Sequence, residues 1–309
     1  MVRRPPARGD DQWFLYPSRL PGHDMDLRYA AGVVWLCPTD CRGHPTSLRA
    51  CSKKKGGALL TSSVPGMAWW FAVVESKHEI QNPTSAEKIR LLGERLKLGP
   101  DSRVLDMGSG RGGPAVLLAR SFGCRITCVE QSEEFLRAAK ERIKQARVGA
   151  LVELVHSDGK EFPIEADSYD SALCLGASFI WGGLTETVAA LAPGVRGGGF
   201  VAVGEPYWRR WPLPHEFEPQ EGWDFVSLPE TVTRFEKPGV ELVTLIASSQ
   251  DDWDAYESLH WFAVEEWLHD NPEDPDAQRF GDMSRYFRDT YLQWTRELLG
   301  WAIFVGRKR

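Results

Sequence analysis

Short apolar runs alternate with longer helical stretches between about residue 85 and residue 204. A helical period places Ile89, Leu92 and Leu96 on or near one face of a helix over 85–96, which follows capping and turn residues at 82–85. Strands separated by helices indicate an α/β fold, in which a parallel sheet has helices on both faces. The predicted strands are 103–107, 125–129, 152–155, 171–175 and 199–204, and the predicted helices between them are 113–121, 132–146 and 184–191.

The C-terminal part departs from this alternation. Residues 240–246 and 301–305 read as two further strands, the second of which closes the sheet. A helical insertion is predicted between them over about 250–299, with helices at 251–269 and 279–299. It is too long for a hairpin loop. The insertion is therefore either a lid over a substrate pocket or a flank that stabilises the sheet edge.

The first 66 residues show no sustained helical or strand period. They contain seven prolines, ten Lys or Arg residues and five Asp residues but no Glu. Their net charge is therefore +5, whereas the net charge of the whole chain is −6. We expect a disordered or non-domain N-terminal extension over 1–66 and one domain over 67–309. A targeting peptide is the alternative, although an amphipathic or apolar core region is missing. The spacing of Cys37, Cys41, His44 and Cys51 fits none of the usual zinc-ligand pairs.

A glycine-rich turn follows the first strand of the alternating region. Residues 104–113 read Val-Leu-Asp-Met-Gly-Ser-Gly-Arg-Gly-Gly, and an apolar run at 115–119 continues them. This order predicts a buried strand, a tight turn and a helix start, the layout of a nucleotide-binding βα unit. Glycine suits the turn because it adopts positive φ and lets the backbone approach a ligand closely. Gly108, Gly110 and Gly113 also match the dinucleotide fingerprint, which is weak evidence by itself.

Two acidic residues bear on which cofactor such a turn binds. Asp106 lies at the carboxyl end of the strand, where its charge would oppose a pyrophosphate. The ammonium and sulfonium groups of S-adenosylmethionine are positive, so Asp106 favours that cofactor over NAD. Glu130 ends the second strand and can accept hydrogen bonds from both ribose hydroxyls, a role common to both cofactors. Glu130 therefore supports the fold but does not distinguish S-adenosylmethionine from NAD.

From about residue 78 to residue 309 the chain resembles the class I S-adenosylmethionine-dependent methyltransferases. The matching motifs occur in the family's order, at 104–112, 128–132, 156–159, 169–176 and 197–205. The resemblance implies a doubly wound, mostly parallel, seven-stranded Rossmann-like sheet with an antiparallel last strand and the helical insertion before it. The cofactor-binding residues that it implies are Asp106, Gly108, Ser109, Gly110, Gly112, Glu130, Gln131, Asp158, Gly159 and Gly176.

Two of these positions keep a second interpretation. Asp158 matches the loop where the family holds adenine through an aspartate, but it can also be a turn residue before Gly159. Gly176 would let the methionyl end of the cofactor approach the backbone, and it can also be an ordinary glycine at a strand end. More narrowly, residues 176–183 and the sequence Gly-Glu-Pro-Tyr-Trp at 204–208 resemble a group of bacterial small-molecule methyltransferases.

Methyl transfer needs few catalytic groups, because positioning carries most of the rate. Glu205, at the end of the fifth strand, is the candidate base or amine ligand, with a helix cap or a salt bridge to Arg209 or Arg210 as the alternative. His215 is a second catalytic candidate, and His78 is a candidate substrate contact that is expected to close over the cofactor. Aromatic substrate contacts are expected from three residues, or else these residues pack against the insertion: Trp181, Tyr207 and Trp208.

Composition narrows the function further. The net charge of −6 is unlike that of a nucleic-acid binder, and no apolar run reaches the ~18 residues of a membrane span. Three of the six cysteines fall in or next to predicted buried strands, which is consistent with a reducing, cytoplasmic location. No metal site is expected. We therefore expect a methyltransferase with a small-molecule acceptor, with a non-catalytic S-adenosylmethionine binder, an RNA methyltransferase and an NAD-linked oxidoreductase as alternatives.

Overall fold

The computed structural model describes residues 26–30, 33–37, 67–220 and 222–309, and these divide into two compact units. The smaller unit contains β1 (Asp26–Ala30) and β2 (Val33–Cys37). These strands pair antiparallel, with Asp26 opposite Cys37. The periodicity of the sequence did not predict them. The rest of the prediction for 1–66 falls outside the described residues, as does a zinc cluster that would need residues 41, 44 and 51.

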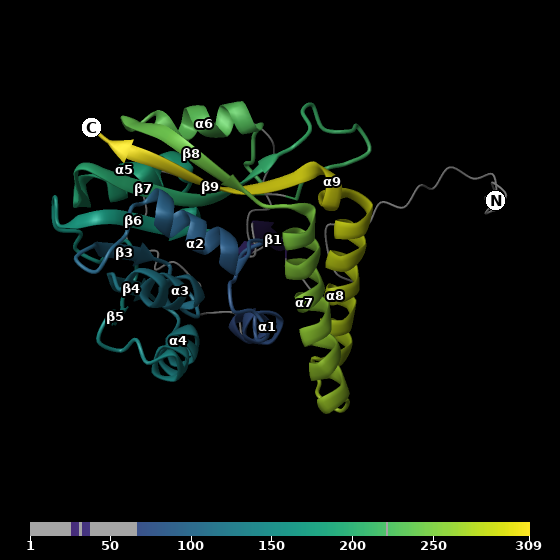
Figure 1. Ribbon diagram of the computed structural model, residues 1–309. Helices are drawn as coiled ribbons and strands as arrows, with labels where there is room; N and C mark the ends of the chain where they lie inside the picture. Colours follow the sequence, from purple (N-terminus) through teal and green to yellow (C-terminus); the bar gives the residue numbers. More distant parts are fainter. Residues whose placement is uncertain (1–25, 31–32, 38–66, 221) are drawn as a thin grey trace, which may run out of the picture. The chain divides into compact units, whose positions relative to one another are not determined.

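The larger unit is built on a seven-stranded sheet with the order β5-β4-β3-β6-β7-β9-β8 (Figure 1). Neighbouring strands from β5 to β7 are parallel, whereas β9 is antiparallel to both β7 and β8. The predicted α/β sheet with an antiparallel last strand is thus confirmed. The strands are β3 (Arg103–Met107), β4 (Arg125–Glu130), β5 (Val152–His156), β6 (Tyr169–Leu175), β7 (Val195–Trp208), β8 (Val240–Ala247) and β9 (Leu299–Lys308).

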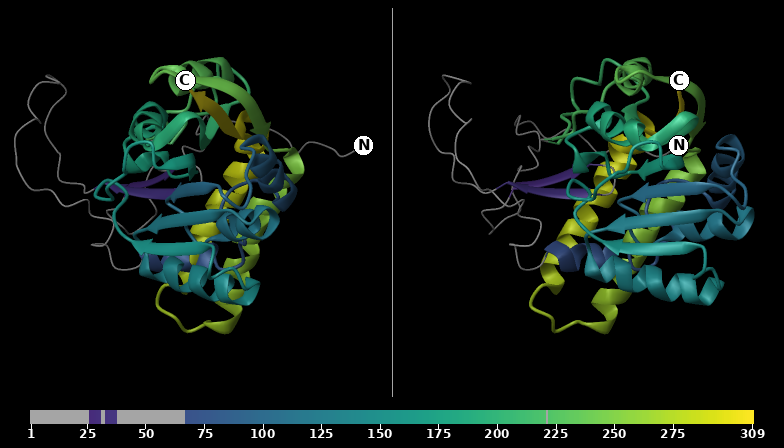
Figure 2. Two further views of the ribbon diagram at one scale, coloured as in Figure 1. Left: turned by 60° about the vertical axis from the view of Figure 1, so that its left-hand side comes forward. Right: turned by 90° about the vertical axis from the view of Figure 1, so that its left-hand side faces the viewer.

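Helices cover both faces of the sheet, as Figure 2 shows. One face carries α2 (Ala86–Arg95), α3 (Gly113–Phe122) and α4 (Glu133–Ala146). The other carries α5 (Leu184–Leu191) and α6 (Leu228–Glu236), with the short 3-10 turns η1 (Ser178–Ile180) and η2 (Ala192–Gly194) beside them. Each of α2 and α4 begins at a serine whose hydroxyl accepts a backbone N–H of the first turn. These caps satisfy donors that a helix start leaves unpaired.

Strand β7 runs four residues past the predicted end at 204. Its parallel neighbour β6 pairs with it only as far as Leu175 and Gly204. Beyond that point β9 continues the pairing on the other side, from Glu205 opposite Ala302 to Trp208 opposite Leu299. Tyr207 and Trp208 therefore lie inside a strand and do not follow it. The predicted strand end at 204 was wrong because the partner strand, β9, comes from about 100 residues later in the chain.

The insertion consists of α7 (Gln250–Asp270), α8 (Ala277–Thr290), a π-helical turn η3 (Tyr291–Thr295) and α9 (Arg296–Leu298). Figure 1 shows α7 and α8 side by side. The predicted helix over 279–299 ends early, because β9 begins at Leu299. Arg296 donates two hydrogen bonds to the carboxylate of Asp254, at 2.9 and 2.8 Å, and so fixes the end of the insertion to α7.

Helix α1 (Met67–Val74) packs on this insertion, and its Trp70 ring meets the edge of Phe280 with centroids 5.1 Å apart. The insertion thereby binds both to the sheet, through β9, and to the segment before α2. Among the described helices, none is both long enough and apolar enough to cross a membrane.

The core between the sheet and α6 depends on Phe235, which is fully buried and lies 6.0 Å from the ring of Phe304. We expect Phe235→Ala to lower the free energy of unfolding by about 3–5 kcal/mol, because it leaves a cavity that the sheet cannot close. Urea unfolding followed by circular dichroism measures this change. Phe262→Ala is the matched control, since Phe262 is 50% exposed. A loss of equal size in both variants would contradict this packing.

Candidate functional site

The glycine-rich turn between β3 and α3 lies in the left-handed region at three positions. Gly108, Gly110 and Gly112 have φ of 68°, 56° and 74°. The amides of Gly108 and Ser109 donate to the carbonyl of Val129, which holds the turn on β4. No side chain caps the first turn of α3, in which Pro114 has no N–H and Val116 donates to the carbonyl of Gly112. The predicted tight turn and helix start are confirmed.

Asp106 is a buried carboxylate beneath this turn, only 2% exposed. Its Oδ2 atom has no hydrogen-bond partner among the described residues. Burial, together with the charge of Glu130, raises the pKa of Asp106 to about 7. A positive group bound above the turn would stabilise the ionised form of this carboxylate.

Glu130 holds the turn from the end of β4. Its Oε2 accepts the N–H of Gly110 at 2.9 Å, and its Oε1 accepts the N–H of Ser132 at 2.8 Å. Each carboxylate oxygen keeps a second lone pair, so acceptance of ribose hydroxyls stays a prediction. Gln131, which follows, is exposed, and its backbone carbonyl lies 3.0 Å from Nε2 of His156.

The next two strand ends lie beside the same turn. Asp158 Oδ1 accepts the N–H of Lys160 at 2.9 Å, which is the contact of a turn residue. Its second oxygen can still bind a ligand, so the adenine role stays a prediction. A Cβ on Gly159 would meet Ile180 at 3.0 Å, and one on Gly108 would meet Ala177 at 2.6 Å. Residues after β5 and β6 therefore pack around the turn.

Residues 78–82, between α1 and α2, cover the glycine-rich turn, and we call them the covering segment. Gln81 Oε1 accepts the N–H of Arg111 at 2.7 Å, directly above Gly110. Asn82 donates to the carbonyl of Leu175 at 3.0 Å, and a Cβ on Gly176 would lie 2.1 Å from its Oδ1. Gly176 thus permits the approach of Asn82, which is a reason for this glycine that the sequence did not reveal.

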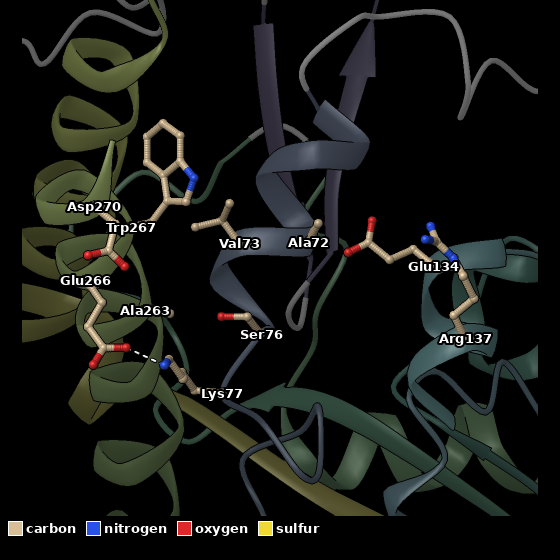
Figure 3. A pocket seen from close by; sticks show the side chains of 10 residues that line it. All are labelled: Ala72, Val73, Ser76, Lys77, Glu134, Arg137, Ala263, Glu266, Trp267 and Asp270. Atoms are coloured by element: carbon tan, nitrogen blue, oxygen red, sulfur yellow. Dashed lines mark ion pairs between the residues drawn. The ribbon is translucent and has the colours of Figure 1, made fainter. Parts of the chain in front are cut away.

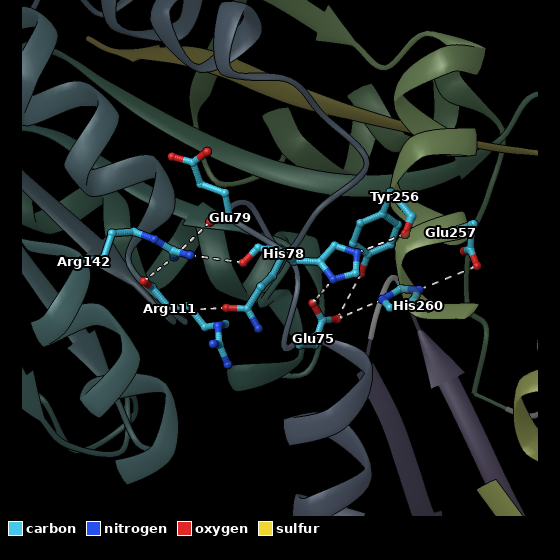
Figure 4. A network of polar contacts seen from close by, with 9 residues as sticks. Glu75, His78, Glu79, Arg111, Arg142, Tyr256, Glu257 and His260 are labelled. Carbon is cyan, nitrogen blue, oxygen red and sulfur yellow. Dashed lines mark hydrogen bonds and ion pairs between the residues drawn. The ribbon is translucent and has the colours of Figure 1, made fainter. Parts of the chain in front are cut away.

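Arg142 of α4 secures the covering segment, as Figure 4 shows. Its guanidinium donates to three carbonyls, those of Glu79, Arg111 and His78, at 3.2, 2.8 and 3.3 Å. Sequence reasoning missed Arg142, Gln81 and Asn82. Residues 82–85 were interpreted only as turn and cap residues, and a lone arginine on an amphipathic helix gives no signal of such contacts.

His78 lies in the covering segment but is fixed toward α7. It is 2% exposed, and its Nε2 lies 3.0 Å from the carbonyl oxygen of Tyr256. Its Nδ1 lies 3.5 Å from Oε2 of Glu75, and Glu75 Oε1 lies 3.2 Å from Nε2 of His260. Burial lowers the pKa of His78. Burial also acts to lower the pKa of His260, but contacts with Glu257 and Glu75 outweigh it and raise the pKa to about 9.

Glu205 directly follows the last residue of β7 that pairs with β6. Its Oε2 atom is buried without a hydrogen-bond partner among the described residues. Burial raises its pKa to about 7, against the lowering effects of the Ser178 hydroxyl and Arg234. The alternative salt bridges are not formed, because Arg209 donates to Gln250 and Arg210 pairs with Glu297.

The remaining predicted residues are placed differently from one another. Tyr207 and Trp208 are buried, and Trp208 meets the ring of Phe217 at 5.8 Å, so both take part in packing. Trp181 is half-buried against the core on the α5 face. His215 has a side chain 90% exposed and lies 3.1 Å from Glu216. The substrate roles of the three aromatic residues and the catalytic role of His215 stay predictions.

A cavity of about 510 Å³ opens between α1, α4 and α7 (Figure 3). An ion pair between Lys77 and Glu266 joins two of its walls. None of the predicted site residues lines it. The lining residues are Ala72, Val73, Ser76, Lys77, Glu134, Arg137, Ala263, Glu266, Trp267 and Asp270.

Comparisons with known proteins agree with this geometry. A family model described as "Methyltransferase domain" matches residues 104–199. The chain is 34% identical over 239 residues to YjhP of Escherichia coli K12, described as uncharacterized, which covers 76% of this chain and 96% of that protein. A structure of an S-adenosylmethionine-dependent methyltransferase from Thiobacillus denitrificans, in complex with S-adenosylhomocysteine, is 35% identical and has a TM-score of 0.71. The match covers 77% of this chain and 98% of that one.

A shorter match concerns a relative with a defined acceptor. The sarcosine/dimethylglycine N-methyltransferase of Halorhodospira halochloris is 36% identical over 74 residues, 24% of this chain and 26% of that protein.

The buried carboxylate beneath the turn should make stability depend on pH. The folded pKa of Asp106 is raised from 3.8 to about 7, so ionisation of Asp106 opposes folding increasingly from about pH 4 and fully above pH 7. We expect Asp106→Asn to stabilise the ligand-free protein relative to the wild type, with an advantage that grows over this range toward roughly 4 kcal/mol at most. Thermal unfolding from pH 4 to pH 8 measures it. The exposed Asp101→Asn controls for the lost charge, and a flat difference for Asp106→Asn would refute the assignment.

Proposed function

The chain belongs to the class I S-adenosylmethionine-dependent methyltransferases, and we propose that it transfers the methyl group to a small molecule by in-line displacement at the sulfonium. The cofactor of the family, S-adenosylmethionine, supplies an electrophilic methyl group. The observation that carries the proposal is the buried, unpaired Oδ2 of Asp106 beneath a turn of left-handed glycines. This arrangement suits a ligand whose positive charge lies close to the backbone.

The cofactor roles follow from the geometry of the turn. Asp106 would attract the methionyl ammonium, and the left-handed glycines at 108–112 would let the ligand approach the backbone closely. Glu130 would accept ribose hydroxyls with its remaining lone pairs while it holds the turn in shape. Asp158 would bind the adenine edge. The neighbouring contacts would come from Gly108, Ser109, Gly112, Gln131, Gly159 and Gly176.

Positioning of the acceptor would supply most of the rate. Effective molarities of well-oriented groups are worth up to about 7–11 kcal/mol. Glu205 is the proposed base or amine ligand, since its pKa of about 7 lets it both hold and release a proton near neutral pH. Trp181 would contribute an aromatic wall. His215 is too exposed to be shielded from water in the described geometry, and we give it no part in the proposed step.

The name of one relative supports a methyl acceptor of low molecular weight. One relative acts, by its name, on sarcosine and dimethylglycine, which are small amines. An amine acceptor would suit a carboxylate such as Glu205 and an aromatic ring such as Trp181. We therefore propose small amines as the first class to test, with formation of S-adenosylhomocysteine as the measurement. Methylation of RNA and of no small molecule would contradict the proposal.

The role of Asp106 predicts how cofactor affinity responds to pH. Because the positive ligand favours the ionised carboxylate, binding of S-adenosylhomocysteine should tighten as the pH rises from 6 to 8. Asp106→Asn should weaken binding by about tenfold or more and remove this dependence. Isothermal titration calorimetry at each pH measures both effects. Asp101→Asn should bind like the wild type, and equal affinities of all three proteins would rule out the ammonium contact.

The role of Glu205 is separable from cofactor binding. We expect Glu205→Gln to lower kcat by about 10²–10⁴-fold if the residue removes a proton, while the affinity for S-adenosylhomocysteine stays within about twofold. Steady-state kinetics with an accepted amine and calorimetry measure the two quantities. Glu241→Gln, an exposed change on β8, is the control. Unchanged kcat in Glu205→Gln would leave Glu205 without a catalytic role.

A further inference from the structure

A second set of buried polar side chains lies away from the glycine-rich turn. Glu75 follows directly after α1, His78 begins the covering segment, and His260 lies on α7. We call these three residues the His–Glu cluster (Figure 4). Glu75 and His78 are each 2% exposed, and the side chain of His260 is 11% exposed. The proposed methyl transfer uses neither Glu75 nor His260.

Hydrogen bonding fixes the tautomer of His78. Its Nε2 faces the carbonyl oxygen of Tyr256, which can only accept, so Nε2 carries the proton. In the neutral ring, Nδ1 then carries a lone pair and can only accept a hydrogen bond. It faces Oε2 of Glu75 at 3.5 Å, and neither atom has a hydrogen-bond partner among the described residues. Two buried acceptors that face one another are unfavourable unless a proton or a metal ion lies between them.

The spacing of the cluster suits one first-row metal ion. Donor atoms of the three residues lie within 4.8 Å of one another. Glu75 is 3.5 Å from His78 and 3.2 Å from His260. A tetrahedral ion with bonds of about 2.0–2.1 Å separates neighbouring donors by roughly 3.3 Å. The two contacts of Glu75 have about this length, but they use different oxygens, Oε2 toward His78 and Oε1 toward His260, so the carboxylate would bind the ion through both oxygens.

The ring nitrogens of His78 and His260 that face away from Glu75 have neighbours of the kind found around metal-bound histidines. The ring nitrogen opposite the metal commonly donates to a carbonyl or a carboxylate, which fixes the ring and raises its basicity as a ligand. His78 has the Tyr256 carbonyl in this position. His260 has Glu257, whose Oε2 lies 3.8 Å from Nδ1. Both contacts come from α7, one turn before His260.

Charge balance points the same way. Glu75 and Glu257 bring two carboxylates into a buried region, where they are 2% and 7% exposed. A divalent ion bound by two neutral histidines compensates both. Burial of an uncompensated charge is costly, so the neutral arrangement is favoured.

We propose that Glu75, His78 and His260 bind one divalent transition-metal ion of the zinc type through two imidazoles and a carboxylate. Nitrogen and oxygen donors of this kind suit Zn²⁺ and Co²⁺, and no thiolate takes part. The ion would join the end of α1 and the covering segment to α7, which lies 185 residues further along the chain. It therefore holds the insertion against the segment that covers the glycine-rich turn.

Metal titration of the full-length protein, purified in chelator and then freed of it, tests the site. We expect one Zn²⁺ per chain with a Kd below about 1 µM and a rise in Tm on binding. Glu75→Gln and His260→Asn should each weaken Zn²⁺ at least about 100-fold, because each removes a ligand. His269→Asn is the matched control, since His269 is an exposed histidine on the same helix. It should bind Zn²⁺ like the wild type.

Two further measurements keep the result interpretable. His78→Gln supplies a third ligand variant if either of the others unfolds, as judged by near-UV circular dichroism. Co²⁺ should give d–d absorption bands without thiolate charge-transfer bands, which separates this site from Cys37, Cys41 and Cys51. The Cys37→Ser/Cys41→Ser/Cys51→Ser variant should therefore keep the Co²⁺ spectrum. Absence of saturable binding, loss of binding in that cysteine variant, or equal affinities of His260→Asn and His269→Asn would each overturn the proposal.

Discussion

The backbone of the glycine-rich turn depends on hydrogen bonds from two sides, and most of the site follows from them. Below the turn, the carboxylate of Glu130 accepts the N–H of Gly110. Above it, Gln81 of the covering segment accepts the N–H of Arg111. Left-handed glycines leave no side chain in the way of either contact. The turn is thus shaped before any ligand arrives, which lowers the entropy that binding must remove.

The insertion acts on this site through packing as well as through pairing. The strand that follows it, β9, pairs with β7 past the end of β6, and Glu205 lies just beyond the parallel part of the sheet. The first helix of the insertion, α7, fixes His78 and therefore one end of the covering segment. The two expectations for the insertion, a lid over a substrate pocket or a flank that stabilises the sheet edge, stay predictions. The structure shows that α7 holds the covering segment through His78.

Much of the fold was predictable because its signals are local. Apolar runs, glycines and capping serines specified the parallel strands, the turn after β3 and the helices between them. Asp106 and Glu130 could be chosen as site residues because strand ends of a parallel sheet meet at one edge. The end of β7, the contacts of Arg142 and the burial of Trp208 were not predictable. Each depends on residues that are distant in sequence, and no short-range period reports them.

By itself, then, the sequence determined the alternation of strands and helices, the family and the choice of a sulfonium cofactor, because the apolar runs and the motifs between 104 and 205 carry that information. Only the tertiary structure decided which polar groups are satisfied. Gly176 makes room for Asn82, and Glu75, His78 and His260 meet in one buried cluster. The physical reason is that burial and hydrogen bonding are properties of neighbours in space. Chain segments 185 residues apart become neighbours only when the insertion folds back onto α1.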